Sequence, residues 1–214
     1  MKKFLIALQF LSALPIKIRG EIQPKDFGKS LLYFPLVGAL IGLVLASLRY
    51  PFIFLPDLVN SILILLTSIF ITGGIHLDGF ADFCDGFYGG KTKQEILGIM
   101  RDSRTGVMGA IGITGILLLK FSLFASISHD VLWKSLIMMA TFSRWSQCLA
   151  CYSSRYARED GKAKFFIEYV TIKEVIIGGL FTIALFWLLH GLRGLILFVL
   201  AFILAFLFIN SVKK

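Results

Sequence analysis

The stretch SILILLTSIFITGGIHLDGFADFCDGFYGG, residues 61–90, passes from an apolar run directly into three aspartates set among glycines. Its first part belongs to an apolar run at 57–75, which is long enough to cross a bilayer because a helix of about 20 apolar residues spans the hydrocarbon core. Its second part gathers Asp78, Asp82 and Asp85 in a chain with only 13 acidic residues. The first part indicates the fold class, and the second indicates a candidate site.

The composition extends the membrane interpretation to the whole chain. The 214 residues are 57% hydrophobic and 16% charged, with a mean hydropathy of +0.83, whereas a soluble domain is about 25% charged. The net charge of +9 could indicate nucleic acid, but in a membrane protein it is better explained by basic loops on the cytoplasmic side. We therefore expect a membrane protein with no nucleic-acid partner.

Six apolar runs predict an all-α, polytopic membrane helix bundle, with residues 1–214 forming a single membrane domain. They lie at about 30–49, 57–75, 107–128, 131–151, 174–190 and 194–211. The segment HGLRG, residues 190–194, predicts a tight hairpin between the last two.

The N-terminal apolar segment, Phe4–Leu14, is too short to span. Eleven helical residues reach about 16 Å, against a hydrocarbon core of about 30 Å. The residue types leave two interpretations open: a retained interfacial or re-entrant helix, and a cleaved signal peptide.

Lysine and arginine are concentrated in three loops, 15–29, 76–106 and 152–173, and are sparse in the alternate loops. The positive-inside rule places these three loops on the cytoplasmic side of the membrane. The two long loops, 76–106 and 152–173, then face the same compartment, and we expect them to share a site at the cytoplasmic end of the bundle.

The aspartates at 78, 82 and 85 are spaced i, i+4, i+7, which places them on one face of a helix. Like charges so placed repel one another unless a cation lies among them. Mg²⁺ is bound by one or two carboxylates plus substrate phosphates, so we predict that Asp78, Asp82 and Asp85 hold Mg²⁺ against a pyrophosphate. The nearby glycines at 79, 86, 89 and 90 are expected to admit phosphates close to the backbone. The alternatives are a solvated helix end and the cation pathway of a transporter.

A second cluster, IMRDSRTGVMG at residues 99–109, sets Arg101 and Arg104 around Asp102 and Ser103. Arginine offers planar, bidentate donors to phosphate, so these four residues are predicted to bind substrate. A plain positive-inside anchor would need neither Asp102 nor Ser103.

Three further polar residues are candidates. Arg144 lies inside a predicted span and needs a partner, whether structural, an aspartate or a substrate phosphate. Arg155 either binds phosphate or anchors its loop. His76 either orients an aspartate, acts as a base or is an ordinary hydrogen-bonding residue.

Five segments together resemble the cobalamin synthase family, the adenosylcobinamide-GDP ribazoletransferases, from about residue 4 to residue 170. They are FLSALPI, FPLVGALIG, GGIHLDGFADFCDG, EILGIMRDSRTGVMG and RYAREDG. The resemblance implies Mg²⁺-dependent transfer of the adenosylcobinamide phosphate group from adenosylcobinamide-GDP to α-ribazole or α-ribazole 5′-phosphate, with release of GMP, in a prokaryotic inner or plasma membrane.

The resemblance also implies roles for the matching residues. The metal ligands are Asp78, Asp82 and Asp85, and either His76 or one of the aspartates acts as the base, so that His76 and Asp82 are the catalytic candidates. The remaining motif residues bind substrate: Arg101, Asp102, Ser103, Arg104 and, more weakly, Arg155. An oligomer is left open.

One departure from the family is visible in the sequence. Family members usually carry a Gly-Gly-x-Thr-Gly-Asp segment and a further acidic helix near the C-terminus, and nothing in residues 171–214 matches them. The expectation is therefore a fragment, or a shortened or split member.

Two other functions compete with this one. CDP-alcohol phosphotransferases also gather aspartates at a helix end, but they usually show Asp-Gly-x-x-Ala-Arg, whereas here Asp82 follows the alanine. A divalent cation transporter would use the acidic face as an entry site, although the acids lie beyond the apolar run.

Overall fold

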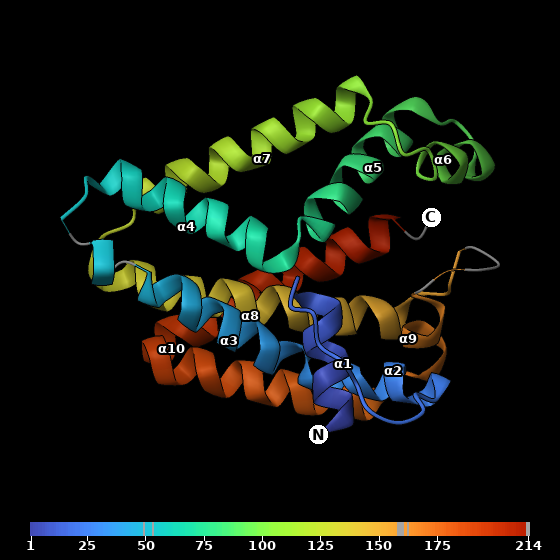
Figure 1. Ribbon diagram of the computed structural model, residues 1–214, viewed down its shortest axis with the longest axis horizontal. Coiled ribbons are helices and arrows are strands. Elements are labelled where there is room, and N and C mark those ends of the chain that lie inside the picture. The colour runs from blue at the N-terminus through green and yellow to red at the C-terminus, as the bar shows by residue number, and fades with distance from the viewer. Residues whose placement is uncertain (49, 53, 158–160, 162, 213–214) are drawn as a thin grey trace. The chain divides into compact units, whose positions relative to one another are not determined.

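The computed structural model describes residues 1–48, 50–52, 54–157, 161 and 163–212, and every regular element within them is a helix (Figure 1). The all-α prediction is therefore confirmed. The chain divides into two compact units, Met1–Leu48 with His129–Lys214, and Arg49–Ser128. We call them the first and the second unit, and the single membrane domain stays a prediction.

The first unit contains both chain ends. Its elements are α1 (Lys2–Leu11), α2 (Pro24–Ser30), η1 (Leu31–Tyr33), α3 (Phe34–Ser47), α8 (His129–Ser153), α9 (Lys164–Tyr169) and α10 (Ile172–Val212). The second unit contains η2 (Tyr50–Phe52), α4 (Asp57–Thr72), α5 (Ile75–Gly89), α6 (Lys93–Ile99) and α7 (Val107–Ser126).

The core of the first unit is the close packing of α3 on α8. Gly38 and Gly42, four residues apart on α3, face the backbone of α8: a Cβ at Gly42 would lie 2.5 Å from the Cα of Ile137, and one at Gly38 would meet the carbonyl oxygen of Ala140. Small residues at this spacing let two helices approach closely in an apolar medium, where burial of apolar surface does not drive association.

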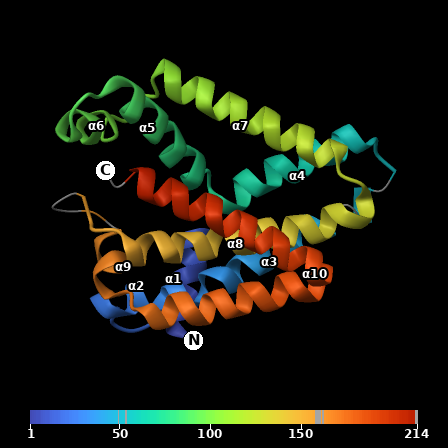
Figure 2. The same ribbon diagram turned by 180° about the vertical axis from the view of Figure 1, so that it is seen from behind.

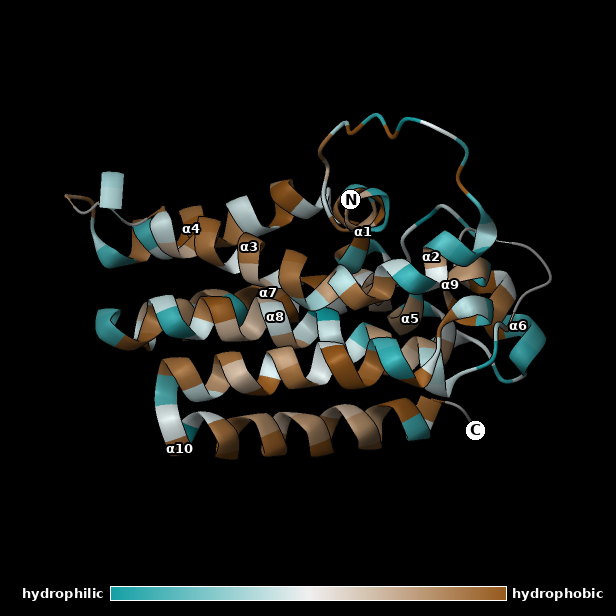
Figure 3. Ribbon diagram, turned by 90° about the horizontal axis from the view of Figure 1, so that it is seen from below, coloured by the Kyte–Doolittle hydropathy of each residue, from teal (hydrophilic) through white to brown (hydrophobic). Residues whose placement is uncertain are grey.

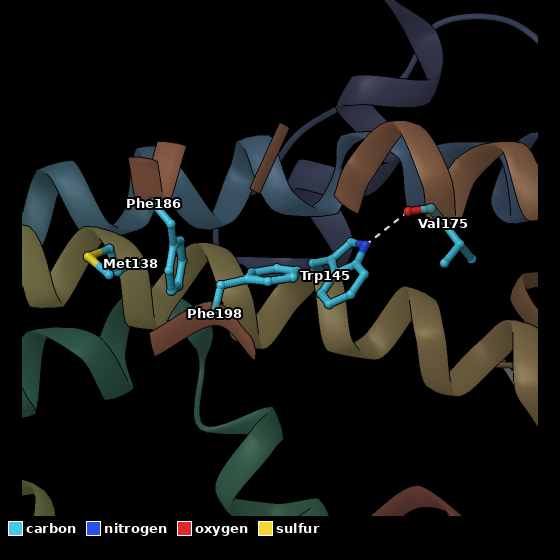
Figure 4. Close-up of a cluster of buried hydrophobic side chains, with 5 residues drawn as sticks. All are labelled: Met138, Trp145, Val175, Phe186 and Phe198. Carbon is cyan, nitrogen blue, oxygen red and sulfur yellow. Dashed lines mark hydrogen bonds between the residues drawn. The ribbon is translucent and has the colours of Figure 1, made fainter. Parts of the chain in front are cut away.

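The helix α10 is a hairpin. Gly191 breaks it with φ 56° and ψ −136°, a conformation that glycine adopts without steric cost. The rings of Phe186 and Phe198, one from each half, meet edge to face at 5.7 Å beside Trp145 of α8, whose Nε1 donates to the carbonyl oxygen of Val175 at 3.0 Å (Figure 4). The hairpin predicted at residues 190–194 is confirmed.

The N-terminal helix is part of this packing. Ile6, Ala7 and Leu11 of α1 are buried, and the ring of Phe10 lies 4.5 Å from that of Phe166 on α9. The prediction of a short N-terminal helix is confirmed, and the choice between a retained helix and a cleaved signal peptide stays a prediction.

Two of the predicted basic loops lie together in the first unit. Gly28 of α2 contacts the backbone of Tyr169 in α9, and the rings of Phe27 and Phe166 meet at 5.4 Å. The helices α2 and α9, which lie within the predicted loops 15–29 and 152–173, therefore pack against each other. The compartment that they face stays a prediction.

Three described helices are long and apolar enough to cross a membrane, or four if the bent pair α4–α5 counts as one span. The three are Pro24–Phe52, Val107–Ser126 and Ile172–Val212, and α10 is apolar along nearly its whole length (Figure 3). The count differs from about six because α10 holds two predicted spans and because α8, with Lys134 and Arg144, is not apolar enough to qualify. The exact number of spans stays a prediction.

Replacing Gly42 by alanine should lower the free energy of unfolding by about 1–3 kcal/mol, because the added methyl group meets backbone atoms that cannot rotate away. The measurement is the thermal unfolding midpoint in one detergent. Gly115→Ala on α7 is the matched control, since no atom lies within 4 Å of its added Cβ. Equal midpoints for the two variants would contradict the close packing of α3 on α8.

Candidate active site

The aspartate-bearing segment forms a helix of its own. Gly73 and Gly74 both have positive φ, 62° and 70°, and the amide of Gly74 closes the end of α4 on the carbonyl oxygen of Ile69 at 3.1 Å. Helices often end in such a left-handed conformation, and glycine adopts it at low cost because glycine lacks a Cβ. The next helix, α5, begins at Ile75 and is bent by 89° from α4.

The acidic residues share α5 as predicted. Asp78 is exposed, and Asp82 and Asp85 are half-buried, at the i, i+4, i+7 spacing that places them along one helical face. His76 is half-buried in the first turn of the same helix. The second unit therefore carries all four residues on one element.

Asp85 binds the start of α7. Its Oδ2 accepts a hydrogen bond from the amide of Gly106 at 2.7 Å, and its Oδ1 accepts one from the amide of Gly109 at 2.7 Å. Gly106 is the N-cap of α7 and Gly109 is its third helical residue. The first amides of a helix have no hydrogen-bond acceptor within the helix. The carboxylate of Asp85 on α5 provides acceptors for two of these amides.

The glycines of α7 are matched to α5. A Cβ at Gly106 would lie 2.5 Å from Oδ1 of Asp85, one at Gly109 would meet Oδ2, and one at Gly112 would lie 2.6 Å from the Sγ of Cys84. Glycine at every third position thus lets the backbone of α7 lie directly against α5.

The glycines at the end of α5 serve packing against α6. A Cβ at Gly86 would lie 2.7 Å from the side chain of Met100, and one at Gly90 would lie 2.7 Å from Ile96; α6 lies beside the end of α5 in both views of the chain (Figures 1 and 2). Side chains of α6 and of the residue after it thus lie against Gly86, Gly89 and Gly90, and the expectation that glycines here admit phosphates stays a prediction. Around Gly79 no atom lies within 4 Å of an added Cβ.

The arginine loop, residues 100–106, joins α6 to α7 and ends at the Gly106 that Asp85 holds. Within it, Arg104 donates from its backbone amide to Asp102 at 3.0 Å and from its guanidinium at 3.1 and 2.7 Å. The side chain of Arg104 is 88% exposed. These hydrogen bonds lower the pKa of Asp102 to about 2 and raise the pKa of Arg104.

Two carboxylates of α5, those of Asp78 and Asp82, remain as candidate ligands for a magnesium ion. Among the described residues no group of three His, Cys, Asp or Glu side chains is placed to hold a metal, and both oxygens of Asp85 bind amides. Asp78 and Asp82 lie one turn apart on α5, and Mg²⁺ is commonly bound by one or two carboxylates with substrate phosphates and water completing its shell. The predicted metal roles of Asp78, Asp82 and Asp85 stay predictions.

The remaining predicted residues belong to the first unit. Arg144 is buried on α8, where its Nη1 donates to the hydroxyl of Ser143 at 2.8 Å and its Nε has no hydrogen-bond partner among the residues described. Arg155 is exposed just after the end of α8. The site shared between loops 76–106 and 152–173 stays a prediction.

Comparison with known proteins decides the family. The model of the cobalamin-5-phosphate synthase family matches residues 3–214. This chain belongs to that family. The match extends through the α10 hairpin, beyond the residue 170 at which the resemblance in the sequence ended.

Curated relatives in this family carry one enzyme name. Proteins named adenosylcobinamide-GDP ribazoletransferase from Geotalea daltonii and Clostridium acetobutylicum are 35% and 32% identical to this chain, over 91% and 98% of it and 79% and 84% of their own lengths. A third, from Acetivibrio thermocellus, is 34% identical over 92% of this chain and 80% of its own length. The chain is therefore a member of a family of cobalamin-synthesising enzymes. No solved structure matches it.

The hydrogen bonds between Asp102 and Arg104 make a prediction about titration. The pKa of Asp102 should be about 2, so the pair is intact above the ordinary carboxyl value of 3.8 and its contribution to stability is lost as the pH falls through about 2. Carboxyl ¹³C shifts of aspartate-labelled protein in micelles measure this value.

The variant Arg104→Gln should return the pKa of Asp102 toward 3.8, whereas Arg101→Gln serves as the control and should leave it low. The same pKa in the Arg104→Gln variant and the wild type would show that Arg104 does not hold Asp102.

Proposed function

We propose that this chain transfers the adenosylcobinamide phosphate group from adenosylcobinamide-GDP to α-ribazole or α-ribazole 5′-phosphate and releases GMP. The observation that carries the proposal is the match to the family over residues 3–214, together with relatives named for this transfer. The second unit adds a carboxylate helix joined to an arginine loop, which are the two groups that transfer at a pyrophosphate requires.

The transfer is a displacement at phosphorus. With either acceptor, the oxygen of a ribose hydroxyl forms a bond to the cobinamide-side phosphorus, the bond from that phosphorus to the bridging oxygen breaks, and GMP leaves with the bridging oxygen. The attacking hydroxyl loses its proton, and we assign that proton to His76 or Asp82, both on α5.

The metal and the arginines have separate proposed roles. Asp78 and Asp82 would hold Mg²⁺, which when bound neutralises charge on the phosphates. Arg101 and Arg104 would bind the pyrophosphate oxygens, since a guanidinium matches two such oxygens at once. Asp102 holds the guanidinium of Arg104, whose side chain is 88% exposed, and Ser103 would add a hydroxyl donor to the same loop.

Arg144 and Arg155 are proposed to bind further anionic groups of the substrate. For Arg144 the support is its buried Nε, which has no acceptor among the described residues, whereas a buried guanidinium donor normally has one. We also propose that the α5 end, the arginine loop and the 152–173 loop face the cytoplasm of a prokaryotic cell, as the lysine and arginine pattern favours.

The direct test is GMP release from adenosylcobinamide-GDP by membranes or detergent-purified protein supplied with α-ribazole and Mg²⁺. GMP and the joined corrinoid should form in equal amounts, and addition of EDTA should stop the reaction. An intact, membrane-inserted protein that yields no GMP with either ribazole acceptor would overturn the proposal.

The variants Asp78→Asn and Asp82→Asn should each lower kcat/KM by about 10²-fold or more, because each removes charge that would hold the metal in the transition state. Steady-state GMP release measures the loss, and membrane insertion is checked by fractionation. Asp130→Asn, an exposed acid at the start of α8, is the matched control and should keep wild-type turnover. Near-normal turnover in either of the α5 variants removes the metal role for that residue.

A further inference from the structure

We infer that Asp85 is a positioning residue that sets the arginine loop against α5, and that it is not a metal ligand. The inference rests on the proposed function for the identity of the reaction, and on the geometry of the second unit for the role of Asp85. Both of its carboxylate oxygens accept amides of α7 at 2.7 Å.

The carboxylate of Asp85 replaces both side chains of a capping box at the start of α7. In a capping box, the N-cap side chain accepts the amide of the third helical residue, and the side chain of that third residue accepts the N-cap amide. In α7 both positions, Gly106 and Gly109, are glycine, so neither amide has such a local partner. Asp85 accepts both from another helix, 21 and 24 residues away in sequence.

The glycines support a permanent role for this contact. A Cβ at Gly106 or Gly109 would collide with the carboxylate oxygens of Asp85. If the carboxylate of Asp85 instead rotated to bind a metal, glycine would no longer be required at positions 106 and 109. The amides of both residues would then lose their acceptor. Loss of an acceptor from a part-buried amide such as that of Gly109 is costly, because an amide that is removed from water needs another acceptor.

The consequence for the site follows from chain length. The arginine loop has only seven residues, 100–106, and Asp85 fixes its last one. Asp82 lies three residues before Asp85 on the same helix, about 4.5 Å along the helix axis. Asp85 therefore sets the distance between the carboxylates proposed to hold the metal and the arginines proposed to hold the phosphates.

The first test uses the wild-type protein in detergent and Mg²⁺ alone as the probe. Amide hydrogen exchange of the peptide that covers residues 104–112 should be slow at Gly106 and Gly109 and should not change when Mg²⁺ is added. Faster exchange at these two amides on addition of Mg²⁺ would show that the metal takes Asp85 from them, and would overturn the inference.

The second test uses Asp85→Asn and Gly109→Ala, with Gly115→Ala as the control because no atom lies within 4 Å of its added Cβ. The first two should speed amide exchange at positions 106 and 109 and raise the KM for adenosylcobinamide-GDP by about tenfold, as expected for lost positioning of binding groups. The Mg²⁺ concentration for half-maximal GMP release should stay within about twofold of wild type, since the metal ligands are intact. Gly115→Ala should match wild type in all three.

A rise in the half-maximal Mg²⁺ concentration with unchanged amide exchange would make Asp85 a metal ligand and overturn the inference. Full protection and an unchanged KM in Asp85→Asn would do the same. A wild-type protein that releases no GMP would instead overturn the proposed function, while the exchange measurements would still decide whether Asp85 holds α7.

Discussion

The contact that organises the second unit is a single carboxylate between two helices. Asp85 of α5 accepts the amides of Gly106 and Gly109 at the start of α7, and this fixes where α7 begins and where the loop before it ends. The glycines at 106, 109 and 112 follow from it, since each lies where a side chain would separate the helices. The aspartates of α5 and the arginines at 101 and 104 are thereby held on neighbouring segments.

In the first unit too, glycines allow the backbones of two helices to approach closely. Gly38 and Gly42 bring the backbones of α3 and α8 together, and α10 folds back at Gly191 so that both its halves pack on Trp145. Apolar helices gain little by burying apolar surface from lipid, so close packing and a few buried hydrogen bonds must join them. In both units the glycines mark where backbones meet.

Much of the fold could be predicted from local patterns. The apolar runs predicted the long helices, and the i, i+4, i+7 spacing correctly placed the three aspartates on one helix. The segment around Gly191 predicted the turn of the α10 hairpin. The partner of Asp85 could not be predicted, because spacing within a helix reports which residues share a face and says nothing about what that face meets. The signal in the sequence is the glycine at every third position from 106 to 112, since three small residues on one helical face indicate close packing against another helix. The polarity of α8 was also underestimated, since its apolar residues are interrupted by Lys134 and Arg144.

The central claim is that α5 lies directly on the start of α7, so that the acidic helix and the arginine loop form one site. Oxidative cross-linking of Gly112→Cys to the native Cys84 tests it most directly, because a Cβ at 112 would lie 3.4 Å from the Cβ of Cys84, close to the spacing of about 3.8 Å in disulfides. After tryptic cleavage between the two positions, the fragments that carry them should stay joined until they are reduced, whereas Gly115→Cys should give separate fragments. Equal cross-linking at 112 and 115, or none at 112, would contradict the account.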